Sequence, residues 1–156
     1  MSNVLTGVGQ SSHKDSFQAG REAAESALAD LGGSPRLSII FGSCRFDHRQ
    51  LLAGVDSVVG QIPMVGGTTA GEIFTSGFAT QSVVIMMLSS EDLTFATGLG
   101  KNMSHDERAC AISLAESLFK KAGAGNALSL VVFPNGMGGD GVRFIEGLHS
   151  VVGKEI

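Results

Sequence analysis

Residues 65–73 carry the densest set of groups in this chain that could bind a small molecule. Three of these residues are glycines, two are threonines and one is Glu72. Glycine lacks a Cβ, so another group can come close to the main chain, while hydroxyls and a carboxylate supply hydrogen-bond partners. Residues 62–65 predict a short strand, and a loop directly after a strand is a common place for a ligand site. The same residues would also suit a tight turn between two buried strands, so both interpretations stay open.

An amino acid is one small metabolite that this chemistry suits. Its carboxylate can be bound by backbone N–H groups or hydroxyls, and its ammonium group needs an acid. Glu72 lies in a stretch with almost no other charged residue. It can pair with a ligand, or it can cap a loop or helix. In the ligand-binding interpretation the contacts come from Gly66, Gly67, Thr68, Thr69, Gly71 and Glu72.

The segment Val65-Gly66-Gly67-Thr68-Thr69-Ala70-Gly71-Glu72-Ile73 resembles the hallmark of the FIST domain, V-G-x-[ST]-T-A-G-E-I. The resemblance covers most of the chain and is to the N-terminal half of that domain. It implies an intracellular sensory domain of bacterial signalling proteins, whose output passes through a partner such as a histidine kinase. Some members are haem-based nitric oxide sensors, so the resemblance leaves haem open as an alternative cofactor. Many relatives have Cys in place of Gly67, so a role for that thiol does not carry over.

Two further strand ends carry polar groups. Ser43 follows a predicted strand at 37–41, and Asn135 and Gly136 follow a predicted strand at 128–133. In α/β sheets, ligands bind beyond the carboxyl ends of parallel strands. If these strands are parallel to the strand at 62–65, all three loops lie on one edge of the sheet. We therefore expect Ser43, Asn135 and Gly136 to contribute to the ligand site.

No catalytic motif stands out in the sequence. It contains no G-x-S-x-G elbow, no P-loop and no G-x-G-x-x-G after a strand. Cys44, next to Arg45, could be a nucleophile, and a hydrolase or transferase that uses Cys44 or a threonine is the alternative from another functional class. Because no base lies at a fixed spacing from Cys44, we interpret Cys44 and Cys110 as packing residues and expect no enzyme activity.

The four histidines, at positions 13, 48, 105 and 149, are scattered along the chain. No two of them have a spacing such as H-x-x-x-H, which would let both bind one metal ion. This argues against a zinc site built by this chain alone. A single axial ligand is enough for haem, so the spacing does not decide that alternative.

The composition excludes several classes of partner. The chain has 156 residues, of which 43% are hydrophobic and 17% charged, as in a packed soluble domain. Its formal net charge is −4 and it has no basic stripe, which argues against nucleic acid and anionic membranes. The sequence has no recognisable signal peptide, and its longest apolar run, 83–88, is too short to cross a bilayer. We therefore expect a cytoplasmic protein.

Apolar runs alternate with stretches that have helix caps. Strands are predicted at 4–9, 37–41, 62–65 and 128–133, an antiparallel hairpin at 81–88 and 93–99, and helices at 16–31, 47–59, 104–122 and 139–152. This order predicts an α/β fold: a mixed sheet with parallel βα units and an antiparallel hairpin, flanked by helices.

The βα unit that starts at Leu37 is echoed by the unit that starts at Leu128, and each ends in Ser-Val-Val-Gly. The first unit continues into the glycine-rich segment, whereas the second stops at Ile156. We therefore expect residues 1–156 to be a single sensory domain that is truncated at its C-terminal end.

Overall fold

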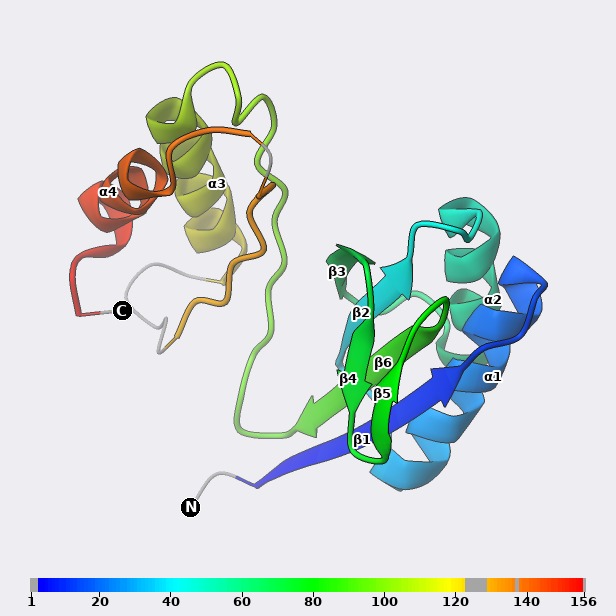
Figure 1. Ribbon diagram of the computed structural model, residues 1–156. Helices are drawn as coiled ribbons and strands as arrows, with labels where there is room; N and C mark the ends of the chain where they lie inside the picture. Colours follow the sequence, from blue (N-terminus) through cyan, green and yellow to red (C-terminus); the bar gives the residue numbers. More distant parts are fainter. Residues whose placement is uncertain (1–2, 123–128, 137, 156) are drawn as a thin grey trace. The chain divides into compact units, whose positions relative to one another are not determined.

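The computed structural model describes residues 3–122, 129–136 and 138–155, in two compact units (Figure 1). Unit 1 comprises Met1–Phe95 and unit 2 comprises Ala96–Ile156, and each is described by itself. The described residues form four helices, a mixed four-stranded sheet with one parallel pair, and a separate two-stranded antiparallel hairpin. The predicted α/β fold class is therefore confirmed.

Unit 1 contains the sheet, with strand order β1-β6-β2-β3. Its elements are β1 (Val4–Ser11), α1 (Ser16–Leu31), β2 (Leu37–Ser43), α2 (His48–Val59), β3 (Met64–Thr69), β4 (Glu72–Phe74), β5 (Gly77–Ala79) and β6 (Val83–Ser90). Strand β6 runs antiparallel to both β1 and β2, and β2 runs parallel to β3. The carboxyl ends of β1, β2 and β3 therefore lie at one edge of the sheet, where β6 begins. We call this the strand-end edge.

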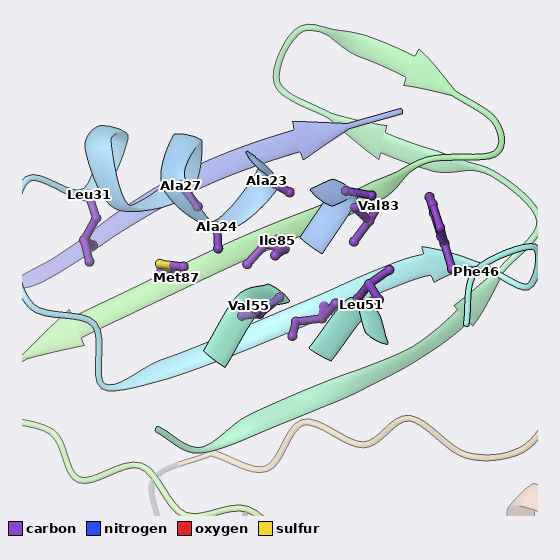
Figure 2. Packing of buried hydrophobic residues seen from close by; sticks show 12 residues of the cluster. Ala23, Ala24, Ala27, Leu31, Phe46, Leu51, Val55, Val83, Ile85 and Met87 are labelled. Carbon is purple, nitrogen blue, oxygen red and sulfur yellow. The ribbon is translucent and has the colours of Figure 1, made fainter. Parts of the chain in front are cut away.

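Helices α1 and α2 pack on the sheet through small and aliphatic side chains (Figure 2). Ala23 and Ala27 of α1, Val55 of α2, and Ile85 and Met87 of β6 are all fully buried. Burying each of the larger side chains contributes about 1.5–3 kcal/mol to the stability of the fold. From Ile85 to Leu88 burial alternates along β6, and Ile85 and Met87 pack in the core with the helices. This packing fixes the sheet whose edge carries the predicted ligand residues.

Asp15 and Asp47 are the N-caps of α1 and α2. Asp15 accepts a hydrogen bond from the backbone N–H of Gln18 at 2.9 Å. Asp47 accepts from the N–H groups of Arg49 and Gln50 at 2.9 and 3.1 Å. Gln50, three residues after Asp47, has the spacing of a capping box, in which its side chain would accept from the Asp47 N–H. This N–H donates to the Ser16 hydroxyl at 3.0 Å instead.

Replacing Asp47 with alanine is expected to lower the free energy of unfolding by about 1 kcal/mol, because two N–H groups lose their acceptor. Gln50→Ala should change stability by less than about 0.5 kcal/mol, because Ser16 already serves the Asp47 N–H. Urea denaturation of the two variants measures both values. A larger loss for Gln50→Ala than for Asp47→Ala would contradict this assignment of the cap.

Unit 2 contains α3 (Glu107–Ala122) and α4 (Gly141–Val152), which pack on each other through residues such as Leu114 and Phe144. The predicted N-cap at Ser104 lies two residues before the observed one. Asp106 accepts a hydrogen bond from the Ala109 N–H at 2.9 Å, and because it satisfies this free donor, the helix begins at Glu107.

Two predicted strands are absent from the described residues. Residues 93–99 form no strand, because both sides of β6 are already paired, with β1 and β2. The hairpin lies earlier in the chain, at β4 and β5. Of the predicted strand at 128–133, residue 128 lies outside the described residues and 129–133 form no strand. Its alternating apolar pattern is satisfied differently, since Leu130 and Val132 pack against the core of unit 2.

Candidate functional site

The glycine-rich segment is largely a strand, so its prediction as a loop is wrong. Strand β3 continues through Gly66 to Thr69, and Gly66 is paired with Ile40 of β2. Gly66 has a φ of 149°, and a Cβ at this position would lie 1.8 Å from the Ile40 carbonyl oxygen. The close approach that the sequence predicted is therefore real, but the approaching group is the neighbouring strand.

Gly67 and Thr68 are exposed on β3, the last strand in the order of the sheet. A Cβ at Gly67 would meet nothing within 4 Å, so this position has room for a larger side chain. Gly71 lies beyond the strand, where a Cβ would come within 2.6 Å of the Phe78 ring. Of these three predicted site residues, Gly67 and Thr68 have the space around them that a ligand needs.

Glu72 is buried, with 2% of its surface exposed. One carboxylate oxygen accepts a hydrogen bond from the Thr69 hydroxyl at 2.5 Å. The other accepts from both the backbone N–H of Ser82, at 3.3 Å, and the Ser82 hydroxyl. No cation pairs with Glu72 among the described residues. Through these hydrogen bonds the carboxylate connects the start of hairpin β4–β5 to the end of β3 and to the residue before β6.

Ser43 lies beside this group. It is the register partner of Thr69 at the end of the parallel pair β2–β3, and its N–H donates to the Ser82 carbonyl at 2.9 Å. The structure therefore brings together the predicted residues Ser43, Thr69 and Glu72, and adds Ser82. Ser82 was not predicted as a site residue, because the strand predicted at 81–88 includes it and its partner Glu72 lies ten residues away.

Arg45 extends the strand-end edge toward β1. Its guanidinium donates to the carbonyl oxygens of His13 at 2.7 Å and Ser12 at 3.2 Å, and it lies 4.4 Å from the centre of the Phe46 ring. No carboxylate pairs with Arg45 in the part of the chain that the structure describes. In the sequence, Arg45 was noted only as the neighbour of Cys44. In the structure, it places a positive charge just beyond the end of β2.

Asn135 and Gly136 lie in unit 2, ahead of α4. The Asn135 carbonyl accepts a hydrogen bond from Gly138 at 3.1 Å, and Asp140 caps α4 by accepting from Val142 at 2.8 Å. No strand precedes them in residues 129–133, so the expectation of a third parallel strand end is wrong. Their part in ligand binding stays a prediction.

The cysteines have different surroundings. Cys110 is buried in unit 2, as predicted, and burial raises the pKa of its thiol above the ordinary value, which disfavours the nucleophilic thiolate. Cys44 is exposed, so its interpretation as a packing residue is wrong. The loop after β2 turns the side chain out of the core, while neighbouring Ser43 and Phe46 are buried.

Two further kinds of site are absent from the part of the chain that the structure describes. Within residues 3–122, 129–136 and 138–155, no group of three or more His, Cys, Asp or Glu side chains could hold a metal ion. No helix in the same ranges has the length and apolar character needed to cross a membrane.

The sequence pattern of the FIST N domain matches residues 36–156, which include β2, β3 and hairpin β4–β5. The chain belongs to the FIST N domain family. It is thus a sensory domain of signalling proteins, and this family membership confirms the resemblance seen in residues 65–73.

Other comparisons add little to the FIST assignment. No curated protein matches the chain. Among solved structures, it is similar to FtsZ W319Y mutant, P1, of M. jannaschii, with 17% identity and a TM-score of 0.38 over 56% of this chain and 27% of that one. It is also similar to an empty FtsZ dimer of M. jannaschii, with 18% identity and a TM-score of 0.34 over 63% and 34%. The chain spans about a third or less of these FtsZ chains, and such low TM-scores carry no argument about function.

Proposed function

We propose that this FIST domain senses an amino acid at the strand-end edge and passes the signal to a partner protein, such as a histidine kinase. The family gives the signalling context. We further propose the amino-acid ligand, the partner, a bacterial source and a cytoplasmic location. No catalytic step is assigned to the chain. The proposed ligand contacts are the predicted residues on β2, β3 and the turn to β4, together with Arg45.

The observation that carries the proposal is a pair of charges at neighbouring strand ends, neither of which is neutralised by a partner among the described residues. Arg45 is exposed after β2, and Glu72 is buried after β3. Arginine binds carboxylates through two parallel N–H groups. Two of its donor contacts already go to the carbonyls of Ser12 and His13, which hold the guanidinium in place for an incoming carboxylate.

Hydroxyl groups complete the proposed recognition surface. Thr68 is exposed and Thr69 half-buried at the end of β3, beside Ser43. A carboxylate has about four lone-pair positions, and the hydrogen bonds from Thr69 and Ser82 occupy three of those on Glu72. One position remains, but Glu72 is buried, so its negative charge attracts a ligand ammonium group without direct contact. Its larger contribution is to hold the hydroxyls where the ligand meets them.

Arg45→Gln should weaken binding of the amino acid by at least about tenfold, because it removes the charge that binds the carboxylate. Calorimetric titration of the protein with a panel of free L-amino acids identifies the binder and then measures the variant. Arg49→Gln is the matched control, since Arg49 is exposed on α2 and outside the strand-end edge. Equal affinities of wild type and Arg45→Gln, with the melting temperature preserved, would contradict the proposed site.

A further inference from the structure

A second feature of unit 1 lies away from the strand-end edge. A cavity of about 390 Å³ opens beside β1, between α1 and the turn of hairpin β4–β5. This volume falls within the range of roughly 300–1,000 Å³ that is typical of small-molecule sites. Its lining residues are Val8, Gly9 and Gln10 of β1, Ser26 and Asp30 of α1, and Phe74, Thr75 and Ser76 of the hairpin.

The wall formed by β1 is an edge of the sheet. Val8 does not donate its N–H to β6; the N–H bonds to the Asp30 carboxylate at 2.9 Å. In an antiparallel ladder, the N–H and C=O of one residue point to the same side, and this side alternates along the strand. The C=O of Val8 and both backbone groups of Gln10 therefore point out of the sheet, on the side where Asp30 lies.

Asp30 is the only charged residue among those that line the cavity. It is exposed, and its pairing with a neutral N–H leaves its negative charge uncompensated. Ser26, Thr75 and Ser76 contribute hydroxyls, and Phe74 contributes an apolar surface. The cavity thus combines one anion, backbone donors and acceptors, and a small apolar wall, which together fit a cationic ligand with a carbonyl next to its charge.

We propose that this cavity binds an α-ammonium group followed by a carbonyl, as found in a free amino acid or at the N-terminus of a peptide. The ligand lies opposite Gly9 and parallel to β1. Its ammonium group donates to the Val8 carbonyl and to Asp30, and its carbonyl or carboxylate accepts from the Gln10 N–H. These are the two hydrogen bonds that a residue of a parallel strand makes with its neighbour, and the charge on Asp30 selects a free amino group.

This inference does not rest on the strand-end edge being a ligand site. The two places share the hairpin, which Glu72 fastens at its base while residues 74–76 at its turn line the cavity. Their charged residues are different, because Arg45 lies in the loop after β2 and Asp30 on α1. Variants at these positions therefore separate the two proposals.

The test is calorimetric titration of the whole protein with free L-amino acids, with dipeptides that have the same N-terminal residues, and with N-acetylated forms of both. Asp30→Asn removes the charge, yet its amide oxygen can still accept the Val8 N–H, so the fold is retained. We expect the best free-amine ligand to bind at least about tenfold more weakly to Asp30→Asn, and its acetylated form to bind as weakly to wild type. Asp56→Asn, the same change at an exposed position on α2, should bind as wild type does.

The amino acids and the dipeptides distinguish the two possible sources of the α-ammonium group. Equal affinity for amino acids and dipeptides identifies a free amino acid as sufficient, whereas binding of dipeptides alone identifies a peptide N-terminus. The inference is overturned if no free-amine ligand binds, or if a ligand binds Asp30→Asn as tightly as wild type. A ligand that is lost in Arg45→Gln and kept in Asp30→Asn would overturn this inference and leave the strand-end proposal standing.

Discussion

Replacing Gly66 with alanine is expected to destabilise unit 1 by about 3–5 kcal/mol, a large part of the roughly 5–15 kcal/mol available to a typical domain. The new Cβ would lie 1.8 Å from the Ile40 carbonyl oxygen, so β2 and β3 would have to separate. The φ of 149° adds backbone strain that any L side chain incurs. Gly67→Ala places the same methyl group one residue later, where nothing lies within 4 Å, and should cost less than about 1 kcal/mol.

Urea denaturation, monitored by circular dichroism, compares the stabilities of the two alanine variants directly. The adjacent positions share the same strand and composition, so a difference between them reports the contact with Ile40. Similar midpoints for Gly66→Ala and Gly67→Ala would show that the glycines are not required by strand pairing. That result would also reopen the interpretation of residues 66–69 as a loop shaped for a ligand.

The second large effect is expected at Glu72. Glu72→Ala leaves the hydroxyls of half-buried Thr69 and fully buried Ser82, and the Ser82 N–H, without their acceptor. Each buried polar group that loses its partner costs about 1–3 kcal/mol, and allowing for relaxation we expect a total loss of about 2–4 kcal/mol. Hydrogen exchange should accelerate most in β4 and β5, because the carboxylate anchors the base of this hairpin.

Two further variants sharpen the Glu72 result. Glu72→Gln keeps one oxygen acceptor but turns an N–H₂ group toward a donor, so its loss should be smaller than that of Glu72→Ala. Glu91→Ala removes an exposed carboxylate after β6 and should change stability by less than about 0.5 kcal/mol. If Glu72→Ala has the melting temperature and the hydrogen-exchange rates of wild type, the carboxylate does not anchor the hairpin. A direct role in binding a ligand then becomes the better explanation.

Local chemistry in the sequence predicted the helices of unit 1 well. Asp15 and Asp47 are N-caps because short acidic side chains accept from free N–H groups, and Gly32 ends α1 with a φ of 62°. Strands β1 and β2 also lie where their apolar runs predicted them, each extended by two residues. These features depend on residues close together in the chain, so a single sequence contains the information that specifies them.

Features that depend on distant partners were not predictable in this way. Residues 93–99 have the composition of a strand, but no free edge of β6 remains for them. Residues 66–69 have the composition of a loop, but pairing with β2 makes them a strand, and Gly66 accommodates the Ile40 carbonyl. The donors to the Glu72 carboxylate come from positions 69 and 82, which the chain brings together only once β3, the hairpin and β6 are in place.

The strand-end edge as a ligand site is tested most directly by ¹H–¹⁵N spectra of the protein, titrated with the panel of free L-amino acids. The account predicts saturable shifts of the backbone amides of Ser43, Arg45, Thr69 and Ser82 for at least one amino acid, and their loss in Arg45→Gln. Saturable shifts that leave these four amides unmoved, or the absence of any saturable shift across the panel, would contradict it.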